Sequence, residues 1–457
     1  MKILLIVSLY PPVRHTGALR WTRLCRRLLN KGCEFQVITT TPGFWSPDQE
    51  DADVLKDVNT TRIDYPSNFV MGYMKGWMWL VKKLGSKFHS VNQSGKKPVN
   101  GKKEDKSLSL KSIVKKTIKN VVKLPQRMIN RLAFPHHSKY WARSVVKHCL
   151  KTYEAKDFDI IIASHPYAGT LIAAEEISDS WGVPWVADFR DPWTHDMQSP
   201  LRGNSRMLNK LWEFERKTLE SASAVVSINR QMCEYINSQS TKTQVITNSY
   251  EPGDYTYEKN ELETGDADEL VLCYTGNIAE DHEYRLFLDG LRLLQDEGVR
   301  AVKLNYYGGA FHRLENYANE IDLSTDYLID HGMVKHEEAN QSLANADCGL
   351  VFGWCGSLAR LVSTGKIFDS LGVGSPIIGI CAVPDSGMED IIINSGSGVV
   401  LNNPKKIAET IIGAIAAKKN DQLDTFMSPS CSEDGWKQYT TEQTAEEYLK
   451  LLQSLVI

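Results

Sequence analysis

The sequence predicts an α/β protein with two doubly wound halves, each a parallel β-sheet covered by helices. Short apolar runs alternate with helical patterns along most of the chain, an order that is typical of parallel sheets. The alternation occurs twice, once on each side of an acidic stretch at residues 258–269. The length of 457 residues corresponds to roughly two or three domains, which excludes a single small core.

The first half begins with a strand, a helix and a second strand. Ile3 to Val7 is a continuous apolar run, which indicates a strand buried on both faces of its sheet. In the following helix, apolar side chains recur at helical spacing and arginines occupy the other side; Lys31-Gly32 ends it before the strand Phe35–Thr39. The apolar positions are Trp21, Leu24, Cys25 and Leu28, and the arginines are Arg20, Arg23, Arg26 and Arg27.

The same alternation continues to the end of the chain. We expect strands at Phe158–Ala163, Pro184–Asp188 and Ala224–Ser227, with a helix at Tyr167–Ser178. After the acidic stretch, strand-like runs occur at LVLCYTG, KLNYYGG, YLIDHG, CGLVFGW and PIIGIC, and a last helix covers Glu442–Leu452. The predicted domains are residues 1–249, an acidic linker 250–269, residues 270–430, and a segment 431–457 whose helix packs back toward the N-terminal domain.

The net charge of −3 conceals one strongly basic segment. Residues 75–131 carry 16 Lys and Arg against 2 acidic residues, a charge of +14, and the other 400 residues carry −17. The segment lies in an insertion, residues 69–135, that begins rich in Met and Trp and ends in a predicted amphipathic basic helix, Leu108–Leu132. Two interpretations remain open: a solvated loop without a partner, or attachment to an anionic membrane surface. The acidic body argues against a nucleic-acid partner.

The cysteines and the apolar runs indicate the compartment. The nine cysteines form no C-x-x-C pair or metal-ligand cluster, so we expect them to be reduced and mostly buried. No apolar run reaches the roughly 18 residues of a membrane span, and the N-terminal run is too short for a secretory signal. We expect a cytoplasmic protein, peripheral on the cytoplasmic face of the membrane where the insertion binds lipid.

The segment STGKIFDSLGVGSP, residues 363–376, carries the most chemistry. Ser363 or Thr364 is suited to cap a helix whose free amides and Lys366 would face a diphosphate. Asp369 lies one turn further on nearly the same face, where a carboxylate accepts hydrogen bonds from ribose hydroxyls. The alternative is a surface Lys and Asp pair without a ligand.

This segment resembles the K-[LI]-F-E-Y-L-A-x-G-x-P-I signature of glycosyltransferase family four, of the polysaccharide-biosynthesis type. Further pieces resemble that family in order: Y-P-P-x(4)-G with an Arg-bearing helix, WGVPWVADFRDPW, VITNSYEP, YTGN, and HGMVKHEEANQSLANADCGLVF. The resemblance covers nearly the whole chain except residues 69–135. It implies the GT-B fold, in which two Rossmann-like domains face each other across a cleft.

The resemblance also implies roles for individual residues. Thr364, Gly365 and Lys366 would hold the donor diphosphate, Asp369 the ribose, and Met333 and Val334 the base. Gly17 would let the backbone approach the sugar phosphate, or it is a plain structural glycine. His165 follows a strand at the carboxyl edge of the sheet, either near the transferred sugar or bonded to a backbone carbonyl. Asp188, Arg190 and Asp191 form either a buried ion network or an acceptor contact, and Trp193 is a candidate for stacking on a sugar.

Two positions depart from the family pattern. Leu361 stands where many members have a second acid, and Asn277 replaces an Arg that often follows the glycine corresponding to Gly276. Arg285 or His282 would then supply the missing cation. These departures bear on donor contacts rather than on the fold.

The implied activity is transfer of a sugar from a nucleotide-diphosphate sugar to a saccharide acceptor, lipid-linked, in cell-surface polysaccharide or glycan assembly. The resemblance implies a retaining hexosyltransferase that uses no metal and no cofactor. His165, Arg285 and Lys366 are the expected catalytic residues, and Gly17, Asp191, Asn277, Met333, Val334, Thr364, Gly365 and Asp369 the expected donor and substrate contacts. An epimerase or hydrolase of the same fold and a non-catalytic membrane-surface scaffold are the alternatives.

Overall fold

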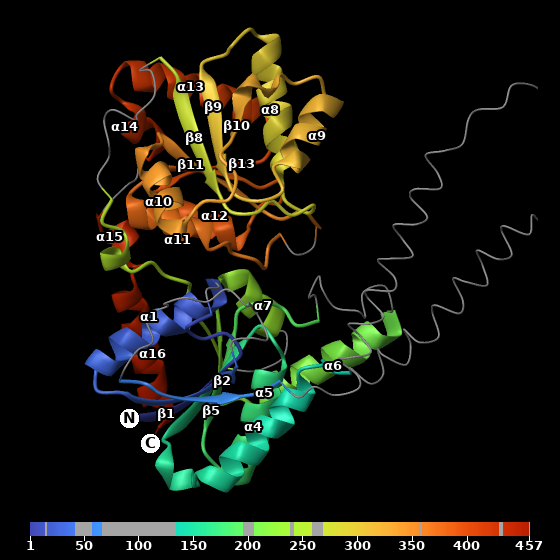
Figure 1. Ribbon diagram of the computed structural model, residues 1–457, viewed down its shortest axis with the longest axis vertical. Helices are drawn as coiled ribbons and strands as arrows, with labels where there is room; N and C mark the ends of the chain where they lie inside the picture. Colours follow the sequence, from blue (N-terminus) through green and yellow to red (C-terminus); the bar gives the residue numbers. More distant parts are fainter. Residues whose placement is uncertain are drawn as a thin grey trace, which may run out of the picture.

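The computed structural model has two parallel α/β sheets stacked along the long axis of the molecule (Figure 1). It describes residues 1–13, 16–41, 57–65, 134–194, 205–237, 242–257, 268–356, 359–428 and 433–456. Residues 69–133 of the predicted insertion, which include its predicted basic helix at 108–132, and residues 258–267 of the acidic linker lie outside these described residues.

The N-terminal sheet has seven parallel strands in the order β3-β2-β1-β4-β5-β6-β7. The chain starts in the middle, moves to one edge and returns to build the other half, which is the doubly wound topology that the sequence predicted. The strands are β1 (Lys2–Val7), β2 (Glu34–Thr40), β3 (Asn59–Ile63), β4 (Ile160–His165), β5 (Trp185–Phe189), β6 (Ala224–Ser227) and β7 (Thr243–Val245).

The C-terminal sheet repeats this plan with six parallel strands in the order β10-β9-β8-β11-β12-β13. Its winding direction reverses between β8 and β11, as that of the first sheet reverses between β1 and β4. Ligands of such sheets bind at the carboxyl ends of the strands beside the reversal. The strands are β8 (Leu270–Thr275), β9 (Val302–Tyr307), β10 (Leu328–Asp330), β11 (Cys348–Phe352), β12 (Ile377–Ile380) and β13 (Gly398–Leu401).

Strand β1 is buried on both faces, as its uninterrupted apolar run predicted. Leu4 and Ile6 enter one core, and Ile3, Leu5 and Val7 enter another on the opposite side of the sheet. The first core is closed by α4 (Lys139–Thr152), α5 (Gly169–Trp181) and α6 (Ser205–Ser221), and the second by α1 (Thr16–Asn30) and α16 (Thr441–Leu455).

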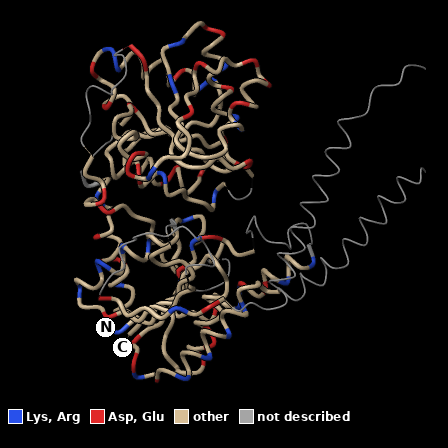
Figure 2. Tube along the Cα trace, viewed as in Figure 1, with Lys and Arg blue, Asp and Glu red and all other residues tan. Residues whose placement is uncertain are grey.

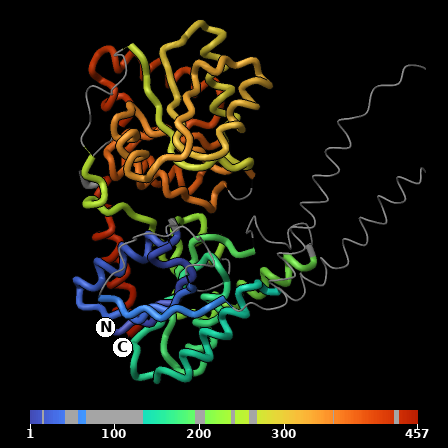
Figure 3. The backbone as a smooth tube through the Cα atoms, in the orientation of Figure 1, coloured from blue at the N-terminus to red at the C-terminus, as the bar shows by residue number. Residues whose placement is uncertain are grey.

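Helix α16 returns from the C-terminal domain to lie beside α1 (Figures 1 and 3). Thr440 accepts a hydrogen bond from the Gln443 amide at the start of the helix, and Ala445, Tyr448, Leu451 and Leu452 enter the core beneath β1. The last helix of the chain therefore packs on the N-terminal domain.

The remaining helices complete the layers. They are α7 (Arg230–Asn237) in the N-terminal domain, and α8 (Tyr284–Asp296), α9 (His312–Glu320), α10 (His336–Asn345), α11 (Lys366–Val373), α12 (Gly387–Ser395), α13 (Pro404–Lys419), α14 (Leu423–Met427) and α15 (Glu433–Lys437) after it. Among the described residues no helix is long and apolar enough to cross a membrane. The cysteines that the structure describes form no disulfide bond, and all but Cys355 are buried.

Candidate active site

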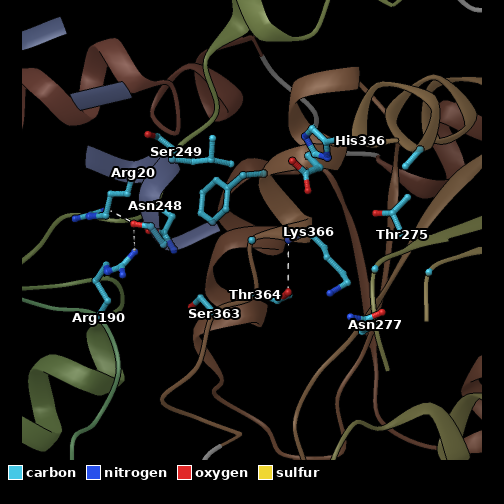
Figure 4. A pocket seen from close by; sticks show the side chains of 18 of the residues that line it. Arg20, Arg190, Asn248, Ser249, Thr275, Asn277, His336, Ser363, Thr364 and Lys366 are labelled. Atoms are coloured by element: carbon cyan, nitrogen blue, oxygen red, sulfur yellow. Dashed lines mark hydrogen bonds between the residues drawn. The ribbon is translucent and has the colours of Figure 1, made fainter. Parts of the chain in front are cut away.

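A cavity of about 550 Å³ lies between the two domains, at the carboxyl ends of both sheets. Figure 4 shows Arg20, Arg190 and Asn248 on one side of this space, and Lys366, Asn277 and Thr275 on the other. Nine of the predicted site residues line it: Gly17, Asp191, Asn277, Met333, Val334, Thr364, Gly365, Lys366 and Asp369. The structure therefore brings together residues that are up to 352 positions apart in the printed sequence.

We call the side of the cavity that the C-terminal domain forms, with Thr275, Asn277 and Lys366, the donor wall. It is built around the start of α11. Helix α11 begins at Lys366, and Thr364 Oγ1 accepts a hydrogen bond from the Lys366 amide at 3.5 Å. Gly365, which also lines the cavity, is the residue before the helix, so its own amide and the first amides of the helix have no carbonyl partner one turn earlier. The aligned amides and the positive end of the helix favour an anion here.

The Lys366 side chain crosses from α11 to the end of β8. Its Nζ lies 5.3 Å from the centroid of the Tyr274 ring, and a Cβ on Gly276 would come within 3.0 Å of its Cε. Gly276 also has a φ of +103°, a conformation that favours glycine. Burial lowers the pKa of Lys366, and Asp369 opposes that shift. The Lys366 ammonium can therefore lie at the cavity because residue 276 is a glycine and leaves room for it.

Asn277 stands beside this lysine with its amide orientation defined. Its Oδ1 accepts a hydrogen bond from the Gly309 amide at 2.7 Å, so the Nδ2 group is the remaining donor of the side chain. A Cβ on Gly308 would lie 2.2 Å from the Gly276 carbonyl oxygen, so the two loops can approach only because glycine occupies that position. Asn277 thus offers a neutral donor where the family pattern has a cation.

The predicted base contacts, Met333 and Val334, also line the cavity. Met333 is 82% exposed and follows Gly332, whose φ is +68°. His336, the first residue of α10, also lines the cavity. Sequence reasoning did not select His336, although it follows Met333 by only three positions.

The opposite wall is formed by arginines of the N-terminal domain. Arg20 and Arg23 extend from α1, and Arg190 follows β5; all three line the cavity and are at most 9% exposed. The sequence placed Arg20 and Arg23 on the polar side of their helix but assigned them no role. Their i, i+3 spacing on a helix that follows the first loop was the available signal.

Asp188 belongs to a buried network, one of the two alternatives left open by the sequence. Its Oδ1 accepts hydrogen bonds from Arg20 Nη2 at 3.1 Å and Tyr448 OH at 2.5 Å. Its Oδ2 accepts from Trp21 Nε1 at 2.9 Å and Ser164 Oγ at 2.7 Å. Burial opposes ionisation, but Arg20, Arg190 and these donors hold the pKa of Asp188 below its ordinary value. The carboxylate therefore joins β4, β5, α1 and α16.

Arg190 is not one of the four donors to Asp188. Its Nε donates to the His165 carbonyl oxygen at 2.8 Å and its Nη1 to the Gly17 carbonyl oxygen at 3.4 Å. Burial lowers its pKa in spite of the neighbouring Asp188 and Asp191. The guanidinium thus spans two predicted site residues and faces the cavity beside Asp191.

Two of the three expected catalytic residues are not among the cavity-lining side chains. His165 is 4% exposed, and its ring lies 5.3 Å from that of Phe189. Burial and then Arg190 lower its pKa to about 3, so the imidazole is neutral at physiological pH. Trp193 is likewise 2% exposed and packs edge-on against Phe214, which leaves no face for a sugar.

Arg285 lies outside the cavity on α8. It forms an ion pair with Glu280, and its guanidinium covers the rings of Tyr284 and Tyr317. His282 is nearer to Lys366, but burial and then Lys366 lower its pKa to about 4. Neither side chain supplies a cation to the cavity, and Lys366 alone carries that charge on the donor wall among the described lining residues.

Glu215 braces the loop that carries Asp191. This residue of α6 is 2% exposed and accepts hydrogen bonds from the Thr194 amide at 2.6 Å and Tyr235 OH at 2.8 Å. Burial raises its pKa to about 7 although both donors oppose the shift. The pKa of Glu215 therefore lies near neutrality, in contrast to that of the buried Asp188, which is lowered.

We expect Glu215 to make the protein less stable as the pH rises from about 4.5 to about 7. In this range the unfolded chain releases the proton that the folded state retains, so unfolding becomes easier. The free energy of unfolding of Glu215→Gln relative to wild type should increase by up to about 3 kcal/mol across the range and then level off. Urea denaturation at a series of pH values measures it. Glu213→Gln, on the exposed side of α6, is the matched control, and parallel curves for wild type and Glu215→Gln would contradict the expectation.

Comparison with known proteins agrees with this geometry. Residues 120–248 match a family model described as Glycosyl transferase 4-like domain. A search of curated protein sequences found no significant match. The family-model match over these 129 residues and the GT-B fold of the two facing doubly wound domains support a glycosyltransferase of the family-four type, in agreement with the resemblance read from the motifs.

Solved structures show the same fold at low sequence identity. The sucrose-phosphate synthase of Thermosynechococcus elongatus is 15% identical, with a TM-score of 0.59 over 99% of this chain and 98% of that one. The Anabaena protein HepE, in complex with UDP and glucose, is 12% identical, with a TM-score of 0.59 over 99% of this chain and 100% of that one. A putative UDP-N-acetylglucosamine 2-epimerase from Listeria monocytogenes is 11% identical, with a TM-score of 0.51 over 99% and 96% of the two chains.

Proposed function

We propose that this glycosyltransferase moves a hexosyl group from a nucleoside diphosphate sugar to a saccharide acceptor, with retention. The observation that carries the proposal is the cavity itself. Lys366 and the α11 amides face Arg20, Arg23 and Arg190 across it, and Asp369 lies one turn into α11. Cations and free amides suit a diphosphate, and a carboxylate beside them suits the ribose.

The donor contacts follow from the two walls. Thr364, Gly365 and Lys366 hold the diphosphate, Asp369 the ribose, and Met333 and Val334 the base. Asn277 donates from Nδ2 to the phosphate or the sugar. Gly17 and Asp191 line the N-terminal side, where the acceptor enters and where Arg190 links the start of α1 to the residues after β5. His165 acts as a positioning residue, because its carbonyl oxygen accepts the Arg190 hydrogen bond.

The chemistry requires no strong nucleophile from the protein. The bond between the anomeric carbon and the β-phosphate oxygen breaks, and its electron pair remains on the departing nucleoside diphosphate. The acceptor oxygen bonds to the same face of the anomeric carbon, and its proton passes to the departing phosphate. Lys366 and the α11 amides stabilise the charge that develops on the β-phosphate, as preorganised donors do in other active sites. This proposal assigns no step to a metal.

A panel of radiolabelled nucleotide sugars, tested with and without lipid extract, examines the proposed activity. We expect one donor to yield a labelled saccharide product only when acceptor is present. A free sugar formed without acceptor would favour a hydrolase, and an altered nucleotide sugar would favour an epimerase. Donor binding without any turnover would favour a scaffold.

We further propose that the acceptor is lipid-linked, in cell-surface polysaccharide assembly, and that the enzyme works at the cytoplasmic face of the membrane. The charge of +14 on residues 75–131 supports this location. Helix α4, a few residues beyond the insertion, has exposed Arg143, Lys147 and Lys151 and no acidic residue. In Figure 2, Lys and Arg positions lie along the lower part of the molecule, where Figure 1 labels α4. Each basic residue near an anionic surface contributes about 1 kcal/mol.

Removing residues 69–131 should abolish binding to vesicles that contain phosphatidylserine while leaving nucleoside diphosphate binding within about twofold, since the cavity lies between the domains. Vesicle co-sedimentation and calorimetry measure the two properties. A full-length variant with the lysines of residues 75–131 changed to glutamine is the control for folding and should lose vesicle binding to the same degree. Unchanged binding of either variant would refute the membrane assignment.

A further inference from the structure

Tyr255 contacts the proposed ribose carboxylate from outside α11. It lies in the segment that leads from β7 toward the second domain and is 8% exposed. Its hydroxyl donates a hydrogen bond to Asp369 Oδ1 at 2.7 Å. A Cβ on Gly372 would come within 2.5 Å of its ring, so the ring can lie against α11 only because residue 372 is glycine.

The hydroxyl of Tyr255 is in turn held by Arg23. Arg23 Nη2 donates to the Tyr255 oxygen at 3.3 Å, and its guanidinium lies 5.7 Å from the ring centroid. Arg23 itself is fixed by the Ser249 carbonyl oxygen at 3.0 Å and by Asp254 Oδ2 at 3.0 Å. A guanidinium can only donate, so the Tyr255 oxygen accepts from Arg23 and its single proton goes to Asp369. Burial, with Asp369 next, raises the pKa of Tyr255 above its ordinary value, which keeps this proton in place.

The hydrogen bonds from Arg23 to Tyr255 and from Tyr255 to Asp369 occupy Oδ1 of the carboxylate and fix its orientation. Its Oδ2 is then the atom presented to a ligand in the cavity. A hydrogen bond to a charged group is stronger and shorter than one between neutral groups, so Tyr255 limits rotation of the carboxylate. Arg23 and Asp369 both line the cavity, so these two hydrogen bonds connect its N-terminal wall to its donor wall.

We propose that Tyr255 is a positioning residue that sets the selectivity of the site for the ribose hydroxyls, with Arg23 fixing its hydroxyl from the opposite domain. The inference rests on the proposed function, since it takes Asp369 as the ribose ligand. Tyr255 does not contact the sugar in this assignment. It determines which carboxylate oxygen the ribose meets.

The test compares binding of UDP and 2′,3′-dideoxyuridine diphosphate by calorimetry, for wild type and Tyr255→Phe. Wild type should bind UDP more tightly, and Tyr255→Phe should reduce that preference by about tenfold, the effect of one hydrogen bond to a charged group. Affinity for the dideoxy compound should stay within about twofold. If Tyr255 had a purely structural role, Tyr255→Phe would weaken the binding of both diphosphates equally. The ratio of their affinities would then stay at the wild-type value, which would overturn the inference.

Two further variants make the test specific. In Asp369→Asn the preference for UDP should already be lost, and adding Tyr255→Phe should change the ratio no further. Tyr257→Phe, at a ring 6.5 Å from Tyr255, should retain the wild-type ratio. If wild type itself does not distinguish the two diphosphates, the assignment of Asp369 to the ribose fails and this inference with it. If wild type distinguishes them and Tyr255→Phe does so equally, only the inference fails.

Discussion

Lys366→Ala should lower kcat by about 10² to 10³-fold, the cost of removing one preorganised donor from an oxyanion site. Lys366 is the one cation on the donor wall among the described lining residues, because Asn277 is neutral and Arg285 pairs with Glu280 elsewhere. The other cations that line the cavity, Arg20, Arg23 and Arg190, belong to the opposite wall. Lys366→Ala should therefore lower kcat strongly and change the KM for the acceptor less.

Initial-rate kinetics with the active nucleotide sugar measure this loss. Thermal unfolding should remain near that of wild type, because Lys366 is only partly buried and is not part of a core. Lys405→Ala, at an 82% exposed lysine on α13, is the matched control and should retain full activity. Near-normal turnover of Lys366→Ala would remove the lysine from the proposed mechanism.

Asp188→Asn should destabilise the N-terminal domain by about 3 to 5 kcal/mol, the range observed when one partner of a buried ion pair is removed. The carboxylate accepts four hydrogen bonds. An asparagine has one acceptor oxygen, and its amide group would meet donors that need acceptors. Arg20 would also keep a buried charge without its counter-ion.

Urea denaturation followed by tryptophan fluorescence measures the loss, since Trp21 donates directly to Asp188. Asp159→Asn is the control, because this exposed acid in the same domain accepts one backbone hydrogen bond and should cost less than about 1 kcal/mol. Tyr448→Phe removes one of the four donors, and its loss in the free energy of unfolding should lie between the losses of Asp159→Asn and Asp188→Asn. Wild-type stability of Asp188→Asn would show that the network does not hold the domain.

Much of the fold was predictable because it depends on local patterns. Continuous apolar runs in parallel sheets are buried on both faces, so β1, β5 and β12 were recognisable, with no end displaced by more than one residue. The strand predicted at Phe158–Ala163 is β4 at Ile160–His165, since pairing with β5 extends it to His165 ↔ Phe189. The helix predicted at Glu442–Leu452 is longer, because Thr440 caps it and its apolar side continues into the core.

The donor wall was also predictable, since one short segment carries most of it. Thr364, Gly365, Lys366 and Asp369 lie within six positions, and helix geometry places them together without any distant contact. Arg285 was predicted at the diphosphate because it begins a helix after β8. The structure instead shows that Glu280 and two tyrosine rings hold it on the outer side.

The sequence by itself determined the two doubly wound halves and the residue types of the donor site, because strand burial and helix termini are set by neighbouring residues. Only the tertiary structure decided which distant side chains complete the site. Arg20 meets Tyr448 across 428 positions, and Tyr255 meets Asp369 across 114. Such pairs leave no periodic signal, since their partners are selected by the packing of α1, α11 and α16 rather than by spacing along the chain.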